Sequence, residues 1–231
     1  MKIMTFNTQH CLNFITKKID FDIMAKAILD CDADVVGLNE MRGLGNHAEY
    51  QEQVEILARL TGMKYYYFGM AFEFSDGPYG NGILSKIPIV NVKTVKIPDP
   101  NPRKYNGYYE TRAVIVAELE NGVNVLVTHV GLNPDEAENA VSTLCENISM
   151  SKCVLMGDFN MTPDNPILST IFDRMTDTAS LFCADKLSFP SDNPECKIDY
   201  IFVSRDAKVL SADIPAIIAS DHRPHIAWVE F

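Results

Sequence analysis

The stretch that decides the fold is CVLMGDFNMTP, residues 153–163. Its apolar start runs directly into the polar turn GDFN, and a proline follows. An apolar run bounded by glycine and proline predicts a buried strand that ends in a turn, because Gly, Asp, Asn and Pro are the usual turn residues. A strand that ends in the carboxylate of Asp158 and the amide of Asn160 also suits a scaffold that delivers polar side chains to a reaction site.

The rest of the chain alternates between apolar runs and helical patterns. Helices are expected near 21–29, 54–60 and 166–174, and a further one after Asn133, which is a plausible N-cap followed by Pro134. Strands are expected at 2–7, 35–40, 65–74, 82–86, 89–97, 111–119, 124–129, 152–159, 197–204, 207–214 and 225–231. This order predicts an α/β protein with two sheets packed face to face and helices outside, in a single domain over residues 1–231.

Composition limits the function. The 231 residues are 47% hydrophobic, so the chain can bury a sizeable core. The net charge is −11 and the pI is about 4.8, whereas a protein that grips long nucleic acid through its phosphates normally has a basic face. Nucleic acid is therefore disfavoured as a partner, but a phosphate-bearing substrate held by a metal ion is compatible with this charge.

The cysteines and the apolar runs indicate the compartment. Six cysteines show no CxxC pair and no regular spacing, which favours free thiols over a disulfide framework. The N-terminus enters a strand-like run at once, without the apolar segment of a signal peptide. No run approaches the roughly 18 apolar residues of a membrane span. A reduced cytoplasmic protein is expected, and its oligomeric state is left open.

Polar residues recur where the apolar strands end. Any one of them has an ordinary structural explanation, such as a loop cap or a turn, but several at strand ends can converge on one cleft. Carboxylate and amide oxygens suit Mg²⁺, with Mn²⁺ as a substitute, and no zinc motif, P-loop or GxSxG is present. The set comprises Asn7, Glu40, His129, Asp158, Asn160, Asp199, Asp221 and His222.

A series of motifs along the chain resembles the endonuclease/exonuclease/phosphatase, or deoxyribonuclease-I-like, family. In order, these motifs are MTFNTQ, VVGLNEM, YGNGILSK, VLVTHV, LMGDFNMTP, KIDYIFVS and ASDHRPH. The resemblance spans nearly the whole chain and implies a four-layer α/β/β/α sandwich with two mixed sheets. It implies a metal-dependent phosphoric-ester hydrolase, in which an activated water attacks phosphorus in line with the leaving group.

The resemblance also implies a role for each residue. Glu40 is the principal metal ligand, with Asn7 beside it and Asp221 near the metal. Asp158 activates the water, and Asn160 holds a phosphoryl oxygen. His222 donates hydrogen bonds to the phosphate and is kept cationic by Asp199, while His129 stabilises charge from the other side. We expect both imidazoles to be cationic donors, because nearby carboxylates raise the pKa of histidine.

Three residues are weaker candidates for substrate binding. Arg112 resembles a family arginine that contacts phosphate, and pairing with Glu110 is the alternative. Asn81 lies in a Gly-Asn-Gly turn that could reach the cleft. Tyr105 lies in the Pro- and Tyr-rich segment 97–110, which either selects the substrate or is an ordinary surface loop.

Three functions are compatible with these residues. The first is a phosphoesterase for a small-molecule or lipid-derived mono- or diester, and the second is a DNA endonuclease or exonuclease with the same chemistry. The third, a non-catalytic binding domain, is disfavoured because a decayed site would be expected to lose members of the set.

Overall fold

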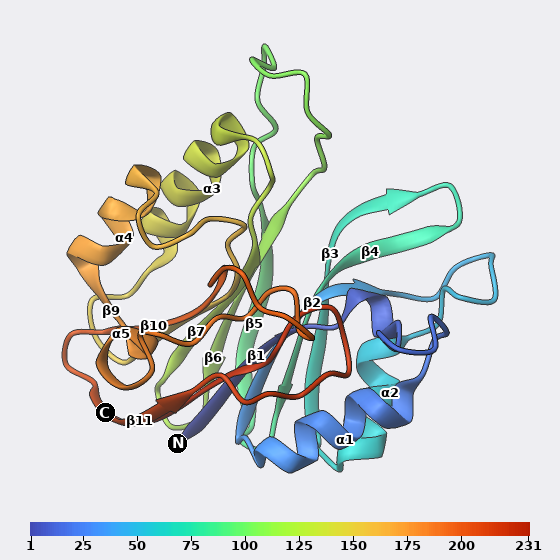
Figure 1. The fold of residues 1–231 in the computed structure, drawn as a ribbon, viewed down its shortest axis with the longest axis horizontal. Helices are drawn as coiled ribbons and strands as arrows, with labels where there is room; N and C mark the ends of the chain where they lie inside the picture. The colour runs from blue at the N-terminus through green and yellow to red at the C-terminus, as the bar shows by residue number, and fades with distance from the viewer.

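The structure, a computed structural model, describes residues 1–231 and has four layers (Figure 1). Two six-stranded sheets pack face to face, with α1 (Phe21–Cys31) and α2 (Gln53–Thr61) outside one sheet, and α3 (Pro134–Asn147) and α4 (Ser169–Arg174) outside the other. The predicted α/β/β/α sandwich is confirmed. The two chain ends lie at the same edge of the molecule, as Figure 1 shows.

The first sheet has the strand order β11-β12-β1-β2-β4-β3, and the second has the order β5-β6-β7-β8-β10-β9. Both sheets are mixed, because β1 and β2 are parallel, as are β7 and β8, while the remaining pairs are antiparallel. The strand bounds in the first sheet are β1 (Lys2–Asn7), β2 (Val35–Arg42), β3 (Tyr65–Phe74), β4 (Gly77–Ser85), β11 (Lys208–Asp213) and β12 (His225–Glu230). Those in the second are β5 (Ile89–Lys96), β6 (Ala113–Leu119), β7 (Asn124–His129), β8 (Cys153–Asp158), β9 (Met175–Asp177) and β10 (Asp199–Ser204).

Three apolar clusters separate the layers. The cluster between the sheets includes Ile3, Val125 and Met156, all fully buried. A second cluster lies between the first sheet and the helices α1 and α2, and a third joins the second sheet to α3 and α4. Strands covered on both faces explain why apolar residues occupy consecutive positions in the sequence.

The start of α3 follows the predicted chemistry, and a cap that was not predicted begins α1. The backbone N–H of Asn133 donates to Glu136 Oε2 at 3.1 Å, and Pro134 opens α3. In α1 the Asp20 side chain accepts from the backbone N–H of Ile23 at 3.1 Å. The predicted helix over 166–174 consists of a 3₁₀ turn (Pro166–Leu168) followed directly by α4.

Three short elements were not predicted: β9, the helix α5 (Thr178–Phe182) and the 3₁₀ turn Gln9–Cys11. Each is too short to show a periodic pattern. The strand expected at 82–86 is also longer than predicted, since β4 begins at Gly77. The glycines of this segment suggested a turn. In the structure they lie in the strand, where a Cβ on Gly80 would be only 2.1 Å from the carbonyl oxygen of Gly69 on β3. Glycine here permits close pairing of β3 with β4.

All six cysteines are free thiols, and four of them are buried. None of the helices combines the length and the apolar character required to cross a membrane.

Candidate active site

Three of the predicted residues form one row across the second sheet. His129 lies opposite Asp158 in the parallel pair β7–β8, and Asp158 lies opposite Asp199 in the antiparallel pair β8–β10. In the first sheet Asn7 lies opposite Asn39 in the pair β1–β2. Strand register therefore brings side chains from distant parts of the sequence to the same end of the sandwich.

The GDFN turn places Asp158 and Asn160. Gly157 has φ +147°, and a Cβ there would meet the carbonyl oxygen of Thr128 at 1.8 Å, so only glycine fits between β7 and β8. Asn160 has φ +51°, a conformation that asparagine tolerates, and its backbone N–H donates to Asp158 Oδ1 at 2.9 Å. The turn thus leaves Asp158 Oδ2 for other partners.

A β-bulge directs Glu40 toward this row. The register between β2 and β4 shifts between Leu38 and Met41, and Glu40 has φ +61°. Bulges re-aim a side chain and are frequent beside active sites. Asn7 Nδ2 donates to Glu40 Oε1 at 3.1 Å and to Asp158 Oδ2 at 3.0 Å, so this one amide joins the two carboxylates across the two sheets.

Asn39 braces the two sheets beneath the site. Its Nδ2 donates to the Thr128 carbonyl at 2.7 Å and to Asn81 Oδ1 at 2.9 Å, and its Oδ1 accepts from the backbone N–H of Asp158 at 3.0 Å. Asn39 is fully buried. We did not predict this residue, although an asparagine inside the apolar run VVGLNEM was a visible signal.

His222 and Asp199 form a close pair. The distance from His222 Nδ1 to Asp199 Oδ2 is 2.8 Å, and both residues are buried. Burial opposes charge on the imidazole, but the carboxylates of Asp199 and Asp158 outweigh it and raise the pKa of His222 to about 10. This imidazole is therefore a cation at neutral pH, as expected, and its Nε2 lies 3.6 Å from Asp158 Oδ2.

His129 has the opposite electrostatic environment. Its Nε2 lies 3.5 Å from Asp158 Oδ2, but its Nδ1 lies 2.9 Å from Arg112 Nη1. Burial and the neighbouring Arg112 and His222 charges lower the pKa of His129 well below its ordinary value. The expectation of a second imidazolium is therefore wrong: His129 is a neutral donor, because an arginine rather than a carboxylate contacts its Nδ1.

Asp158 lies at the centre of these contacts. Burial, reinforced by the charge of Asp199 and opposed by that of His222, raises the pKa of Asp158 to about 7. A carboxyl with this pKa is poised to accept a proton near neutral pH. Its Oδ2 faces the side-chain nitrogens of Asn7, His129 and His222 at 3.0, 3.5 and 3.6 Å.

The donor set around Glu40 fits a hard divalent cation. Burial raises the pKa of Glu40, and the nearest cationic candidate is His10, whose Nδ1 lies 3.9 Å from Oε2. Burial and the charge of Arg42 lower the pKa of His10 to about 4, so this histidine is neutral near pH 7. A largely desolvated carboxylate without a cation in contact has the chemistry of a metal ligand. Asp221, partly exposed, adds a second negative charge near Glu40.

The one group of donors that lies close enough together to hold a metal ion does not include Glu40. Ligand atoms of Asp158, Asp199 and His222 lie within 4.8 Å of one another. Because the pKa of His222 is raised to about 10, its imidazole would have to lose a proton before binding a metal. The oxygens on the Glu40 side fit Mg²⁺ better.

The three weaker candidates lie in different surroundings. Arg112 pairs with Glu110 (Nη1 to Oε1, 2.7 Å), which is the alternative considered for it, and also contacts His129. Asn81 is buried, and its Nδ2 donates to the carbonyl of Ala113 at 2.9 Å. Tyr105 is 47% exposed in the loop between β5 and β6. Substrate contacts by these residues stay predictions.

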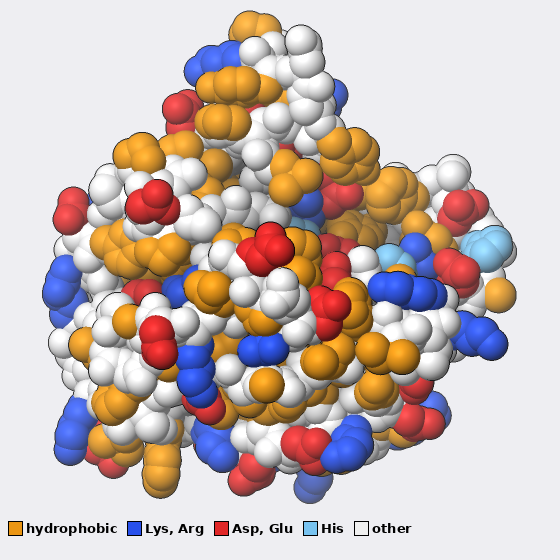
Figure 2. All heavy atoms as spheres, viewed as in Figure 1, with side chains coloured by type: hydrophobic (Ala, Val, Ile, Leu, Met, Phe, Trp, Pro, Cys, Tyr) orange, Lys and Arg blue, Asp and Glu red, His pale blue; other side chains and the backbone are white.

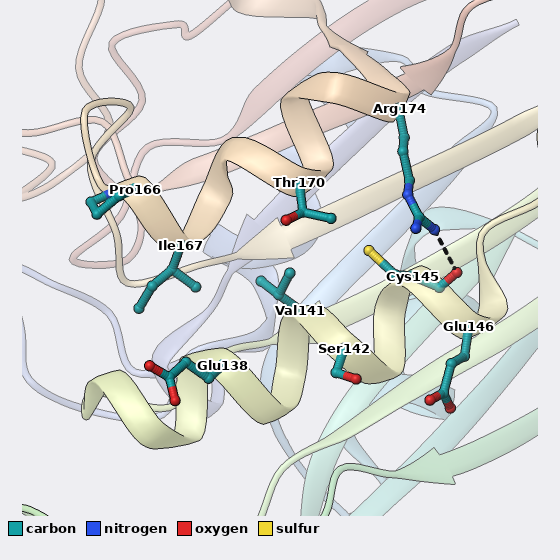
Figure 3. A pocket seen from close by; sticks show the side chains of 9 residues that line it. All are labelled: Glu138, Val141, Ser142, Cys145, Glu146, Pro166, Ile167, Thr170 and Arg174. Atoms are coloured by element: carbon teal, nitrogen blue, oxygen red, sulfur yellow. Dashed lines mark hydrogen bonds between the residues drawn. The ribbon is translucent and has the colours of Figure 1, made fainter.

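Figure 2 shows that the surface is hollowed between the 97–112 loop and the β3–β4 hairpin, with acidic, basic and histidine side chains within the hollow. A separate cavity of about 550 Å³ lies between α3 and α4, lined in part by Val141, Ile167 and Arg174 (Figure 3). None of the predicted site residues lines this cavity.

Comparison with known proteins gives a consistent result. The model of the Endonuclease/Exonuclease/phosphatase family matches residues 4–222. A comparison with curated proteins found no significant match.

Several solved structures are similar to the whole chain. An endonuclease/exonuclease/phosphatase from Beutenbergia cavernae is 21% identical with a TM-score of 0.78, and the match covers 100% of this chain and 71% of that one. A protein of the same description from Bacteroides vulgatus is 20% identical with a TM-score of 0.78, covering 100% and 98%. The Bacteroides thetaiotaomicron mannosyl-6-phosphatase Bt3783 is 15% identical with a TM-score of 0.77, covering 100% of both chains.

Proposed function

Because the chain belongs to the endonuclease/exonuclease/phosphatase family, we propose that it is a Mg²⁺-dependent phosphoesterase. Its substrate is a small-molecule or lipid-derived phosphate mono- or diester, and Mn²⁺ can replace Mg²⁺. Residues 1–231 act as one catalytic domain. The six free cysteines support a reducing, cytoplasmic location.

One observation carries this proposal. Asp158 Oδ2, on a carboxyl whose pKa is raised to about 7, lies 3.5 Å from His129 Nε2 and 3.6 Å from His222 Nε2, and Asn7 joins it to Glu40. Phosphoryl hydrolysis requires a general base and donors that stabilise the phosphoryl oxygens. Here the base lies between two imidazole donors and next to Glu40, a carboxylate that can bind a metal ion.

Each residue then has a part in the reaction. Asp158 orients a water molecule and accepts its proton while the water oxygen forms a bond to phosphorus. The ester P–O bond opposite the water breaks with its electron pair on the leaving oxygen, which takes a proton from solvent, and Asp158 returns the proton that it accepted to solvent. Asn160 and the neutral His129 donate hydrogen bonds to non-bridging oxygens, and the His222 cation stabilises their charge.

A bound Mg²⁺ would be held by Glu40 and Asp221, with Asn7 beside them, and would supply Lewis-acid stabilisation of the phosphoryl oxygens. The partly exposed positions of Asp221 and of Glu40, whose side chain is 24% exposed, are compatible with an ion that keeps several waters.

Charge favours a small substrate over nucleic acid. The chain carries a net charge of −11. Of the two cleft walls, the 97–112 loop contains the basic residues Arg103, Lys104 and Arg112, whereas the β3–β4 hairpin, residues 65–85, contains no lysine or arginine. One structural neighbour is a mannosyl-6-phosphatase, so phosphorylated sugars belong among the substrates to be tested. A DNA nuclease is the second candidate, supported by the family description alone.

The proposal is tested with a panel of phosphate esters in Mg²⁺, Mn²⁺ and EDTA. Aryl mono- and diesters, sugar phosphates, phospholipid headgroup esters, and supercoiled and abasic DNA form the panel. Turnover of a small ester is expected to need the divalent ion and to fall by about 10²–10⁴ in Asp158→Ala. Asp173→Ala, an exposed aspartate on α4, is the matched control and should keep full activity.

Three results would count against the proposal in different ways. Turnover that survives EDTA contradicts the metal requirement. Equal activity in Asp158→Ala contradicts the assignment of the base. DNA cleavage at physiological salt without small-ester turnover favours the nuclease.

A further inference from the structure

We infer that Arg112 is a positioning residue that fixes His129 as the neutral tautomer with its proton on Nε2. Glu110 holds Arg112 in the required place. The catalytic consequence rests on the proposed function, whereas the tautomer itself can be measured without any turnover.

The tautomer follows from the contact at Nδ1. Arg112 Nη1 lies 2.9 Å from His129 Nδ1, and both residues are buried, with 8% and 4% exposure. A guanidinium group only donates hydrogen bonds and does not lose its proton in proteins. His129 Nδ1 must therefore accept, which requires its lone pair, so the single proton of the neutral ring resides on Nε2.

The proton on Nε2 points into the site. The two polar side-chain atoms nearest to Nε2 are Asn160 Nδ2 at 3.2 Å and Asp158 Oδ2 at 3.5 Å. Asn160 Nδ2 donates to the carbonyl of Val130 at 2.9 Å, which fixes this atom as a donor. Of these two atoms only Asp158 Oδ2 is an acceptor, and at 3.5 Å it lies near Nε2 without a hydrogen bond to it, so the Nε2–H group is left to donate to a phosphoryl oxygen.

The charges around His129 support the neutral form. The Arg112 guanidinium lies on its Nδ1 side, and the His222 imidazolium and the Asp158 carboxyl lie toward Nε2. The two cations oppose a third positive charge between them, in addition to the cost of burying it.

Glu110 and its neighbours hold the arginine. Glu110 Oε1 lies 2.7 Å from Arg112 Nη1, and its Oε2 accepts from the hydroxyl of Tyr108 at 3.3 Å. The backbone N–H of Glu110 donates to Glu136 Oε1, in the first turn of α3, at 3.0 Å. The arginine is thus tied to both the 97–112 loop and α3, as a residue that must hold a fixed position requires.

This role differs from a direct grip on phosphate. A phosphate-binding arginine contributes to substrate affinity, and its removal raises KM. An arginine that acts through His129 contributes to the orientation of a donor that stabilises the transition state. Its removal therefore lowers kcat by about 10²-fold while KM changes by less than about threefold.

The test uses the full chain labelled with ¹⁵N in its histidines. Two-bond ¹H–¹⁵N correlation spectra report which ring nitrogen carries the proton, and His129→Gln identifies the signals of His129. We expect wild-type His129 to show a protonated Nε2 and an unprotonated Nδ1 from pH 6 to pH 9. Arg112→Met should yield a mixture of tautomers, together with the loss in kcat for a small phosphate ester.

Controls separate positioning from folding. Arg112→Met leaves the Glu110 carboxylate buried without its partner, so the double variant Glu110→Gln/Arg112→Met tests the tautomer without that unpaired charge. Arg205→Met, which removes an exposed arginine bonded to backbone carbonyls of α4, should change neither the spectrum nor kcat.

Two outcomes would overturn the inference. One is a protonated Nδ1 on His129 in the wild type. The other is an unchanged Nε2–H tautomer in both folded Arg112 variants. A chain that hydrolyses no ester but shows the expected spectra would contradict the proposed function and leave the tautomer assignment standing.

Discussion

The substitution Asp199→Asn tests the charge relationship at the centre of the site. In the proposed mechanism, Asp158 must be ionised to accept a proton, and His222 must be protonated to stabilise the phosphoryl charge. With pKa values raised to about 7 and about 10, the rate is expected to rise through pH 7 and to fall through pH 10. Asn keeps the shape of Asp199 but removes its charge.

The size of the effect follows from one contact. The bond between His222 Nδ1 and Asp199 Oδ2 is 2.8 Å long and joins charged partners, a class of hydrogen bond that contributes about 1.5–3 kcal/mol. One pKa unit corresponds to about 1.36 kcal/mol, so Asp199→Asn should lower the pKa of His222 by about one to two units. The alkaline limb should move down by the same amount.

The raised pKa of His222 also makes the stability of the fold depend on pH. Because the folded state raises the pKa of His222, the pair stabilises the fold below the unfolded pKa of histidine, and this contribution is lost as the pH rises through about 10. Asp199→Asn should therefore be least stable relative to wild type at low to neutral pH, and the difference should shrink at alkaline pH.

The assay is kcat/KM for an aryl phosphodiester between pH 5 and pH 11, with the pKa of His222 read directly by NMR. Asp213→Asn, which removes an exposed partner of Lys186, is the control and should leave the profile unchanged. The reasoning is refuted by an Asp199→Asn protein whose His222 still titrates near pH 10.

Three further substitutions address other parts of the site. Asp158→Asn should lower kcat by about 10²–10⁴-fold and remove the acid limb near pH 7 from any residual activity; a residual profile that keeps this limb contradicts the assignment of the base. Glu40→Gln should melt at a higher temperature than wild type in EDTA, because it removes a partly desolvated charge that lies near Asp221, and it should no longer gain stability from Mg²⁺; an equal Mg²⁺-induced shift in a thermal melt places the ion elsewhere. Asn39→Ala should lower the free energy of unfolding in urea by about 3 kcal/mol or more, since it leaves buried hydrogen-bonding partners unpaired. Substitution of the exposed Asn121 by alanine should lower it far less. Similar losses in the two variants would contradict the role of Asn39 in connecting the two sheets.

Most of the fold was predictable because burial on both faces leaves a plain signal. The strands Lys2–Asn7, Tyr65–Phe74 and Asn124–His129 begin and end as predicted. The early part of β4 was hidden because its glycines serve close strand pairing instead of a turn. The short β9 depends on pairing with β10, a contact that no local pattern encodes.

The composition of the site was predictable, but its electrostatics were not. Glu40 and Asp158 stand out as acids that end apolar strands, and the structure joins them through Asn7. The charge of His129 depends on which residue contacts its Nδ1, and that residue, Arg112, lies directly before a different strand, β6. We expected carboxylates beside both histidines, whereas Arg112, just before β6, contacts His129 at the end of β7.

The arrangement also explains how an acidic chain can attract an anionic substrate. Among the charged groups around Asp158, the fixed cations are Arg112 and His222, and each already faces a carboxylate, Glu110 or Asp199. Among the remaining acids, Glu40 has no cation in contact, and Asp221 lies near it. Without a metal ion the site therefore lacks the positive charge that a phosphate ester requires. If the proposed function holds, we therefore expect from this charge balance, independently of the family, that substrate binding requires a divalent cation at Glu40.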